Sequence, residues 1–229
     1  MTATEPMIAT ERPGSLRDRW AALTGLAGVL LAAGLVGWLD LTTSEDVWRH
    51  TVSGYVFTDP VPFTAAVIAL VLGSATVLLG LLRAGVLAAR HPSVWLLGAW
   101  IAGMTAVAVF PKHDWTVGPS FSGHVHRVAS LVAFVALPLA ILLLTRAAVA
   151  RGMRRAAHLA AGLAIASYAY LGFLAWTVYD AGRTGTPWWQ AVPLGLTERI
   201  LLALEVAALA VVAVGLLRRP VTGAPEKNG

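Results

Sequence analysis

Six long apolar stretches constrain this chain more than any other feature of its sequence. A helix needs about 20 apolar residues to cross a hydrocarbon core of about 30 Å, and strands with an open sheet edge cannot satisfy their backbone groups in lipid. The sequence therefore predicts an all-α, polytopic transmembrane bundle of six helices. The expected spans are Trp20–Leu39, Pro62–Leu82, Val94–Phe110, Arg127–Thr145, Ala157–Trp176 and Thr197–Leu217.

The composition agrees with a chain that meets little bulk water. Only 13% of the residues are charged and 57% are hydrophobic, whereas soluble domains usually carry about 25% charged residues. The net charge of +5 follows from basic residues beside the predicted spans, so membrane lipid is the expected partner and nucleic acid is not. The absence of cysteine excludes disulfides, thiolate catalysis and Cys-ligated metal sites.

The basic residues predict the orientation. Twelve of the 17 Lys and Arg residues lie in residues 1–19, 83–93, 146–156 and 218–229, which alternate with the other loops. Because cytoplasmic loops carry the excess of Lys and Arg, both termini are predicted to be cytoplasmic in a multi-pass protein of the cell membrane. The expected parts are a cytoplasmic tail at 1–19, a membrane domain at 20–218 and a second cytoplasmic tail at 219–229.

The predicted outer loop before the fourth span concentrates groups that can carry chemistry. His113, Asp114, His124 and His126 lie within 14 residues. Imidazole and carboxylate groups are general acids and bases, and they are also metal ligands. A hydrated loop with backbone-bonded histidines is the alternative. On a helix His124 and His126 would point about 200° apart, so no metal and no cofactor are predicted.

The sixth span carries two carboxylates on one helical face. Glu198 and Glu205 are seven residues apart, and Arg199 follows the first of them. A carboxylate about 12 Å below the helix start should face the bundle interior, because exposure to lipid is costly. The expected arrangement is a polar cluster of His126, Arg127, Glu198 and Arg199, with Glu205 below it. The alternative is an internal hydrogen bond that fixes helix packing.

Two further groups of polar residues lie near the predicted outer face. Trp176, Tyr179 and Asp180 follow the spacing i, i+3 and i+4 on one helical face. They could anchor the helix at the membrane interface or line a pocket for an amphipathic ligand. The acidic stretch with Asp40 and Glu45 is expected to be a solvated loop.

Several motifs together resemble one known family. They are Trp95-Leu96-Leu97-Gly98-Ala99-Trp100, Val109-Phe110-Pro111 followed by Asp114, Gly123-His124-Val125-His126-Arg127, Leu137-Pro138 and Gly195-Leu196-Thr197-Glu198-Arg199-Ile200. The chain is similar in these elements, over roughly residues 20–218, to the uncharacterised bacterial membrane-protein family called domain of unknown function 998, which is common in actinobacteria. The resemblance implies no activity. It draws attention to Asp114, His126, Arg127, Glu198 and Arg199.

The leading hypothesis is an integral membrane protein with a polar site at the outer membrane face that binds or acts on an amphipathic lipid or isoprenoid. Asp114, His126 and Glu198 would be its catalytic groups. Its ligand-binding groups would be Arg127, Arg199, Glu205, Trp176, Tyr179 and Asp180. The alternatives are a structural or accessory membrane protein without catalysis, and a membrane-embedded terpene cyclase in which a carboxylic acid protonates the substrate. Whether the protein is an enzyme stays open at this point.

Overall fold

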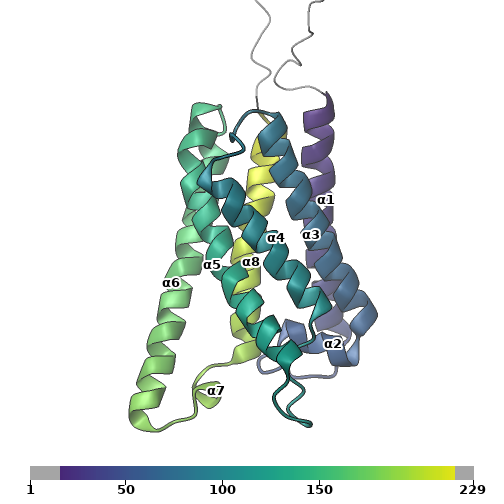
Figure 1. The fold of residues 1–229 in the computed structure, drawn as a ribbon, viewed down its shortest axis with the longest axis vertical. Helices are drawn as coiled ribbons and strands as arrows, with labels where there is room; N and C mark the ends of the chain where they lie inside the picture. Colours follow the sequence, from purple (N-terminus) through teal and green to yellow (C-terminus); the bar gives the residue numbers. More distant parts are fainter. Residues whose placement is uncertain (1–15, 220–229) are drawn as a thin grey trace, which may run out of the picture.

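The structure, a computed structural model, describes residues 16–219 and is all-helical over that range. Six helices in it are long and apolar enough to cross a membrane, which confirms the predicted number of spans. Short helical elements complete the described part of the chain (Figure 1). The long helices are α1 (Leu16–Thr42), α3 (Pro60–Arg83), α4 (Pro92–Val109), α5 (Phe121–Ala150), α6 (Arg154–Thr184) and α8 (Leu194–Leu217), and the short ones are η1 (Val52–Gly54), α2 (Tyr55–Thr58) and α7 (Trp188–Ala191).

The helices pack around α8. This helix contacts α1, α3, α5 and α6, while α1 packs along α3 and α4 packs along α5. The elements η1, α2 and α7 lie at one end of the bundle, together with the loop that joins α4 to α5 (Figure 1). We call this the α2–α7 end. The described start of α1 and the end of α8 lie at the opposite end.

Helices α5 and α6 exceed the spans that hydropathy predicted by more than the other helices do. Helix α5 begins at Phe121, six residues before the expected start, because the Ser120 hydroxyl accepts a hydrogen bond from the Gly123 N–H at 3.0 Å and caps the helix. Helix α6 continues to Thr184 and ends at Gly185, whose φ of 72° suits glycine. Both helices therefore extend the backbone hydrogen-bond ladder past the apolar stretch that defined the predicted span.

Close backbone approach joins α1 to α3. A Cβ added to Gly28 would lie 2.9 Å from the Cα of Gly73, and a Cβ added to Gly73 would lie 2.9 Å from the backbone nitrogen of Val29. Small residues let membrane helices approach until their backbones touch. The two glycines therefore set the spacing of the helix pair that forms one side of the bundle.

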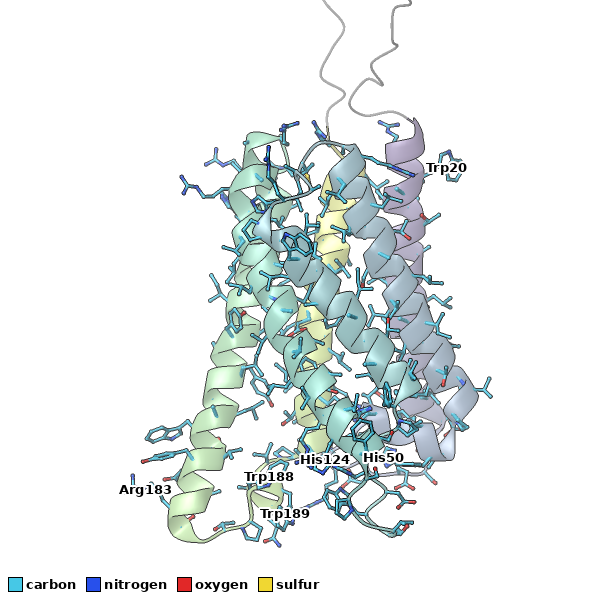
Figure 2. The ribbon with its side chains drawn as sticks, in the orientation of Figure 1. Trp20, His50, His124, Arg183, Trp188 and Trp189 are labelled. Atoms are coloured by element: carbon cyan, nitrogen blue, oxygen red, sulfur yellow. The ribbon has the colours of Figure 1, made fainter. Side chains whose placement is uncertain are left out.

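The predicted cytoplasmic tails fall mostly outside the described residues, which exclude 1–15 and 220–229. Trp20 lies at the end opposite α2 and α7, whereas Trp188 and Trp189 lie at the α2–α7 end (Figure 2). All three are exposed, as residues at a membrane interface are expected to be. Trp100, which was expected within a span, is fully buried, and its indole N–H donates to the Ser74 hydroxyl at 3.0 Å.

Candidate functional site

An ion pair joins the end of α1 to the beginning of α8. The Arg199 guanidinium binds the Asp40 carboxylate through two parallel bonds, Nε to Oδ2 at 2.9 Å and Nη2 to Oδ1 at 2.6 Å. The Tyr55 hydroxyl donates to Asp40 Oδ1 at 2.9 Å, which helps to raise the pKa of Tyr55, although burial is the larger cause. The Arg199 and Asp40 side chains are 15% and 26% exposed, so solvent screens the pair only in part.

The same guanidinium holds the loop that follows α1. Its Nη1 donates to the carbonyls of Val47, His50 and Gly195 at 3.0, 2.7 and 3.0 Å. A Cβ at position 195 would lie 2.5 Å from the first two of these carbonyl oxygens, so the loop can rest on α8 only where α8 has a glycine. Residues 40–55 and the start of α8 are thereby held together by one cation, and we call this arrangement the Arg199 clamp.

A cavity of about 300 Å³ lies directly beside the Arg199 clamp. Its walls come from α1, η1, α3, α4, α5 and α8 and are mostly apolar, with small side chains such as Ala33, Ala66, Ala133 and Ala203. Along α8 the wall runs from Glu198 to Val206, which corresponds to about 12 Å of helix. The charged lining residues lie at the α2–α7 end, and they are Asp40, Glu198 and Arg199.

Glu198 has the fewest partners of the three. Its two carboxylate oxygens share a single donor, the Ser53 N–H, at 3.3 and 3.4 Å. A nearby cation is Lys112, whose ammonium donates to the Thr51 hydroxyl at 2.6 Å. Burial lowers the pKa of Lys112, and the negative charge of Glu198 opposes that shift. Glu198 therefore faces the cavity with a nearby positive charge and with unused capacity to accept hydrogen bonds.

Glu205 lies deeper in α8 and faces the interior, as its position in the span predicted. It is 1% exposed. The Ser167 hydroxyl of α6 donates to its Oε1 at 2.9 Å, and its Oε2 has no hydrogen-bond partner among the described residues. This carboxyl group does not line the cavity, so it joins α8 to α6 rather than contributing to the site.

His113, in the α4–α5 loop, and His126, in the first turns of α5, serve mainly to fix that loop. His126 is buried, and its Nδ1 donates to the carbonyl of Phe110 at 2.8 Å. His113 is also buried, and its Nδ1 accepts from the Ser120 N–H at 2.9 Å. The neutral His113 ring therefore carries its proton on Nε2, and its one lone pair, on Nδ1, is already engaged by the Ser120 N–H. Within residues 16–219 no group of three His, Asp or Glu residues is placed to hold a metal ion.

Asp114 forms a turn within the same loop. Its Oδ1 accepts from the Thr116 N–H at 2.9 Å and from the Thr116 hydroxyl at 2.6 Å, and these bonds lower the pKa of Asp114. The His124 ring packs edge-on against His113, with centroids 4.8 Å apart. Neither Asp114 nor His124 lines the cavity, so the loop chemistry expected from the sequence lies apart from it.

The structure brings together only part of the cluster expected from the sequence. Glu198 and Arg199 meet at the cavity, but no hydrogen bond or ion pair joins either of them to Arg127 in the described part of the chain, and Arg127 is exposed. Trp176 and Tyr179 are 62% and 59% exposed on α6, with ring centroids 5.9 Å apart.

Asp180, on the same exposed stretch of α6, is itself exposed. The Arg183 side chain, at the lower left of Figure 2, lies over the Tyr179 ring, with its Cζ 5.9 Å from the ring centroid. None of these α6 residues lines the cavity, so they form an outward-facing edge of the bundle rather than a wall of the site.

Asp40 was expected in a solvated loop, and the structure corrects this. It lies in the last turn of α1 and is the partner of Arg199. A signal for this was available, because an acidic residue is disfavoured by the negative end of the helix dipole and therefore needs a cation nearby. Tyr55, Ser53 and Lys112 carried no such signal, since their roles depend on how two distant loops meet α8.

The comparisons with known proteins place the chain in a family. Residues 26–215 match the family described as "Protein of unknown function (DUF998)". This match covers most of the chain, which therefore belongs to that family, as the motifs around Phe110, His126 and Glu198 indicated. No curated protein and no solved structure matches the chain.

Proposed function

We propose that this member of the DUF998 family is a multi-pass protein of the cell membrane that binds one amphipathic molecule in the cavity beside the Arg199 clamp. The observation that carries the proposal is the polarity of that cavity, which has about 300 Å³ of space, apolar walls and charged groups at one end only. Ligand sites commonly combine apolar walls with a few polar groups that orient the ligand. A lipid or isoprenoid tail would lie along α8 toward Val206, and its polar head would lie beside Glu198.

The packing of the bundle supports a binding role over a purely structural one. Protein interiors are close-packed, and voids larger than a water molecule are few. Here small side chains from several helices, among them Ala66, Ala133 and Ala203, leave the space open although the same positions could hold larger residues. A scaffold without a ligand would gain stability by filling this space.

Catalysis has less support than binding. Glu198 is the carboxylate that would touch a bound head, whereas Asp114 and His126 are engaged in the α4–α5 loop. A cyclase would need aromatic faces around its cation; Phe63 and Phe134 are the aromatic residues of the described lining, whereas Trp176 and Tyr179 lie outside the cavity. The proposal is therefore confined to binding. The basic loops at the opposite end favour placing the binding site toward the outer face of the membrane.

Two glycines of α1 provide a matched test. A Cβ added to Gly37 or to Gly34 would have no neighbour within 4 Å, so either position can take a larger side chain without a clash at the Cβ. Gly37 lines the cavity, whereas Gly34 is exposed and does not. Gly37→Leu should fill the part of the cavity next to the charged groups, and Gly34→Leu should leave it open.

The readout is native mass spectrometry of protein purified from membranes in mild detergent. We expect the unmodified chain and Gly34→Leu to retain one amphipathic molecule, and Gly37→Leu to lose it. Equal retention by both variants would mean that the molecule binds elsewhere. An empty unmodified protein that also takes up no added lipid or isoprenoid would overturn the proposal.

A further inference from the structure

We infer that the molecule in the cavity carries a hydroxyl headgroup and not a phosphate or a carboxylate. This inference rests on the proposed function, and it concerns which groups the cavity offers to the head. An anionic head needs hydrogen-bond donors or an unengaged cation. A hydroxyl head needs an acceptor for its proton.

The cation that lines the cavity has no donor left for a ligand. A guanidinium has five N–H groups. Those of Arg199 donate to both Asp40 oxygens, to the Tyr55 hydroxyl at 3.3 Å and to three backbone carbonyls. A phosphate could reach this group only by breaking the Arg199 clamp. Arg199, which the sequence suggested as a ligand-binding residue, therefore has no free donor for an anionic head.

The serines of the cavity are engaged as well. The Ser130 hydroxyl donates to the carbonyl of His126 within α5 at 2.9 Å. The Ser53 hydroxyl donates to the Thr51 hydroxyl at 3.3 Å, and the Ser53 N–H donates to Glu198. Each polar side-chain or guanidinium donor of the residues that line the cavity, Ser53, Ser130 and Arg199, therefore already has an acceptor, and Lys112, whose ammonium bonds to Thr51, is not among the lining residues.

Glu198 supplies a hydrogen-bond acceptor with free capacity at the charged end of the cavity. Its carboxylate can accept about four hydrogen bonds, and it receives one shared N–H at 3.3 and 3.4 Å. A hydroxyl at this end can donate a hydrogen bond to Glu198, whereas a fully deprotonated phosphate has no proton to donate to this acceptor.

The charges around the head also balance. Asp40 and Glu198 contribute two negative charges, and Arg199 and Lys112 contribute two positive charges, so the formal sum is zero. A site without net charge gives an ammonium head no long-range advantage over an uncharged one. The geometry therefore points to an alcohol, such as an isoprenoid or long-chain alcohol, rather than to an amine.

The test is a competition against a photoactivatable long-chain alcohol with a diazirine in its tail, using the full chain in nanodiscs. The competitors are dodecanol, dodecyl phosphate and dodecylamine, which share one tail and differ in the head. We expect labelled peptides from α1, α5 and α8. Dodecanol should reduce the labelling by displacing the probe, and both charged competitors should need concentrations higher by on the order of tenfold or more for the same effect.

Two variants refine the test. Glu198→Gln replaces the carboxylate with an amide of similar shape, and it should weaken the binding of dodecanol by on the order of tenfold. Arg127→Gln, on the exposed face of α5, should leave the competition unchanged. Dodecyl phosphate or dodecylamine competing as well as dodecanol would overturn the headgroup inference while leaving the cavity as a binding site. Failure of all three to displace a label, or labelling only outside the cavity, would instead contradict the proposed function.

Discussion

Removing the Arg199 side chain should destabilise the protein strongly. In Arg199→Met the Asp40 carboxylate loses its cation, and the carbonyls of Val47, His50 and Gly195 lose their shared donor. Breaking a buried ion pair by removing one partner destabilises a protein by about 3–5 kcal/mol. The Arg199 and Asp40 side chains are 15% and 26% exposed, so residual screening places the expected loss near the lower value, about 3 kcal/mol.

The loss can be followed as a melting temperature, because the chain contains nine tryptophans whose fluorescence changes on unfolding. For a chain of this size 1 kcal/mol corresponds to about 2–4 °C, so Arg199→Met should melt about 6–12 °C lower. Adding Asp40→Asn should recover part of this loss, because it removes the unpaired charge. The melting temperature of Arg199→Lys should lie between those of the unmodified chain and Arg199→Met. An ammonium keeps the positive charge but lacks the planar fork that binds both Asp40 oxygens.

Arg127→Met is the matched control, because Arg127 is exposed and has no ion pair within the described residues. It should melt within about 2 °C of the unmodified chain. A drop of less than about 3 °C for Arg199→Met, or equal drops for both variants, would refute the reasoning that the clamp holds α1, its following loop and α8 together.

Four other outcomes are expected. A double-mutant cycle on Ser167→Ala and Glu205→Gln should give a coupling of about 0.6 kcal/mol by reversible unfolding in detergent, the average for polar pairs in membranes, and zero coupling would contradict the bond between α6 and α8. Gly123→Ala should lower the melting temperature, because the added Cβ would overlap the His113 ring, and His113→Ala should relieve much of that loss. Burial lowers the pKa of His113, so its contribution to stability should be present above about pH 6.5 and disappear as the pH falls through the lower folded value; an NMR titration of the ring with a midpoint above 6.5 would contradict this. Reporter fusions after residues 50, 115 and 185 should read outside and those after 88 and 150 inside, and one reversed loop would overturn the orientation.

The helices could be predicted because hydropathy and length report directly on the membrane environment. Each expected span coincides with a long helix, and α4, with 18 residues, is the shortest of the six, as its apolar stretch indicated. The ends of α5 and α6 could not be predicted in this way, because the Ser120 cap and the turn at Gly185 lie beyond the apolar segments. Hydropathy shows which residues enter lipid, whereas helix ends depend on local hydrogen bonding.

The site could be predicted only in part. The burial of Glu205 follows from the cost of exposing a carboxylate to lipid. Glu198 and Arg199, which the sequence placed at the mouth of a helix, line the cavity. The partner of Arg199 could not be identified, because Asp40 is 159 residues away in the chain and the pairing depends on how α1 meets α8. The cavity itself left no motif, since the small residues that line it are distributed over four helices, α1, α3, α5 and α8.

The most direct measurement of the central claim is a crystal structure of the protein soaked with a long-chain alcohol that carries a bromine at the end of its tail. The anomalous signal locates the bromine independently of the rest of the density. The proposed binding mode predicts one peak inside the cavity near Leu70 and Val206, about 12 Å along α8 from Glu198, with the hydroxyl against the Glu198 carboxylate. Bromine peaks found only on the outer surface of the bundle, with the cavity collapsed or filled by water, would contradict it.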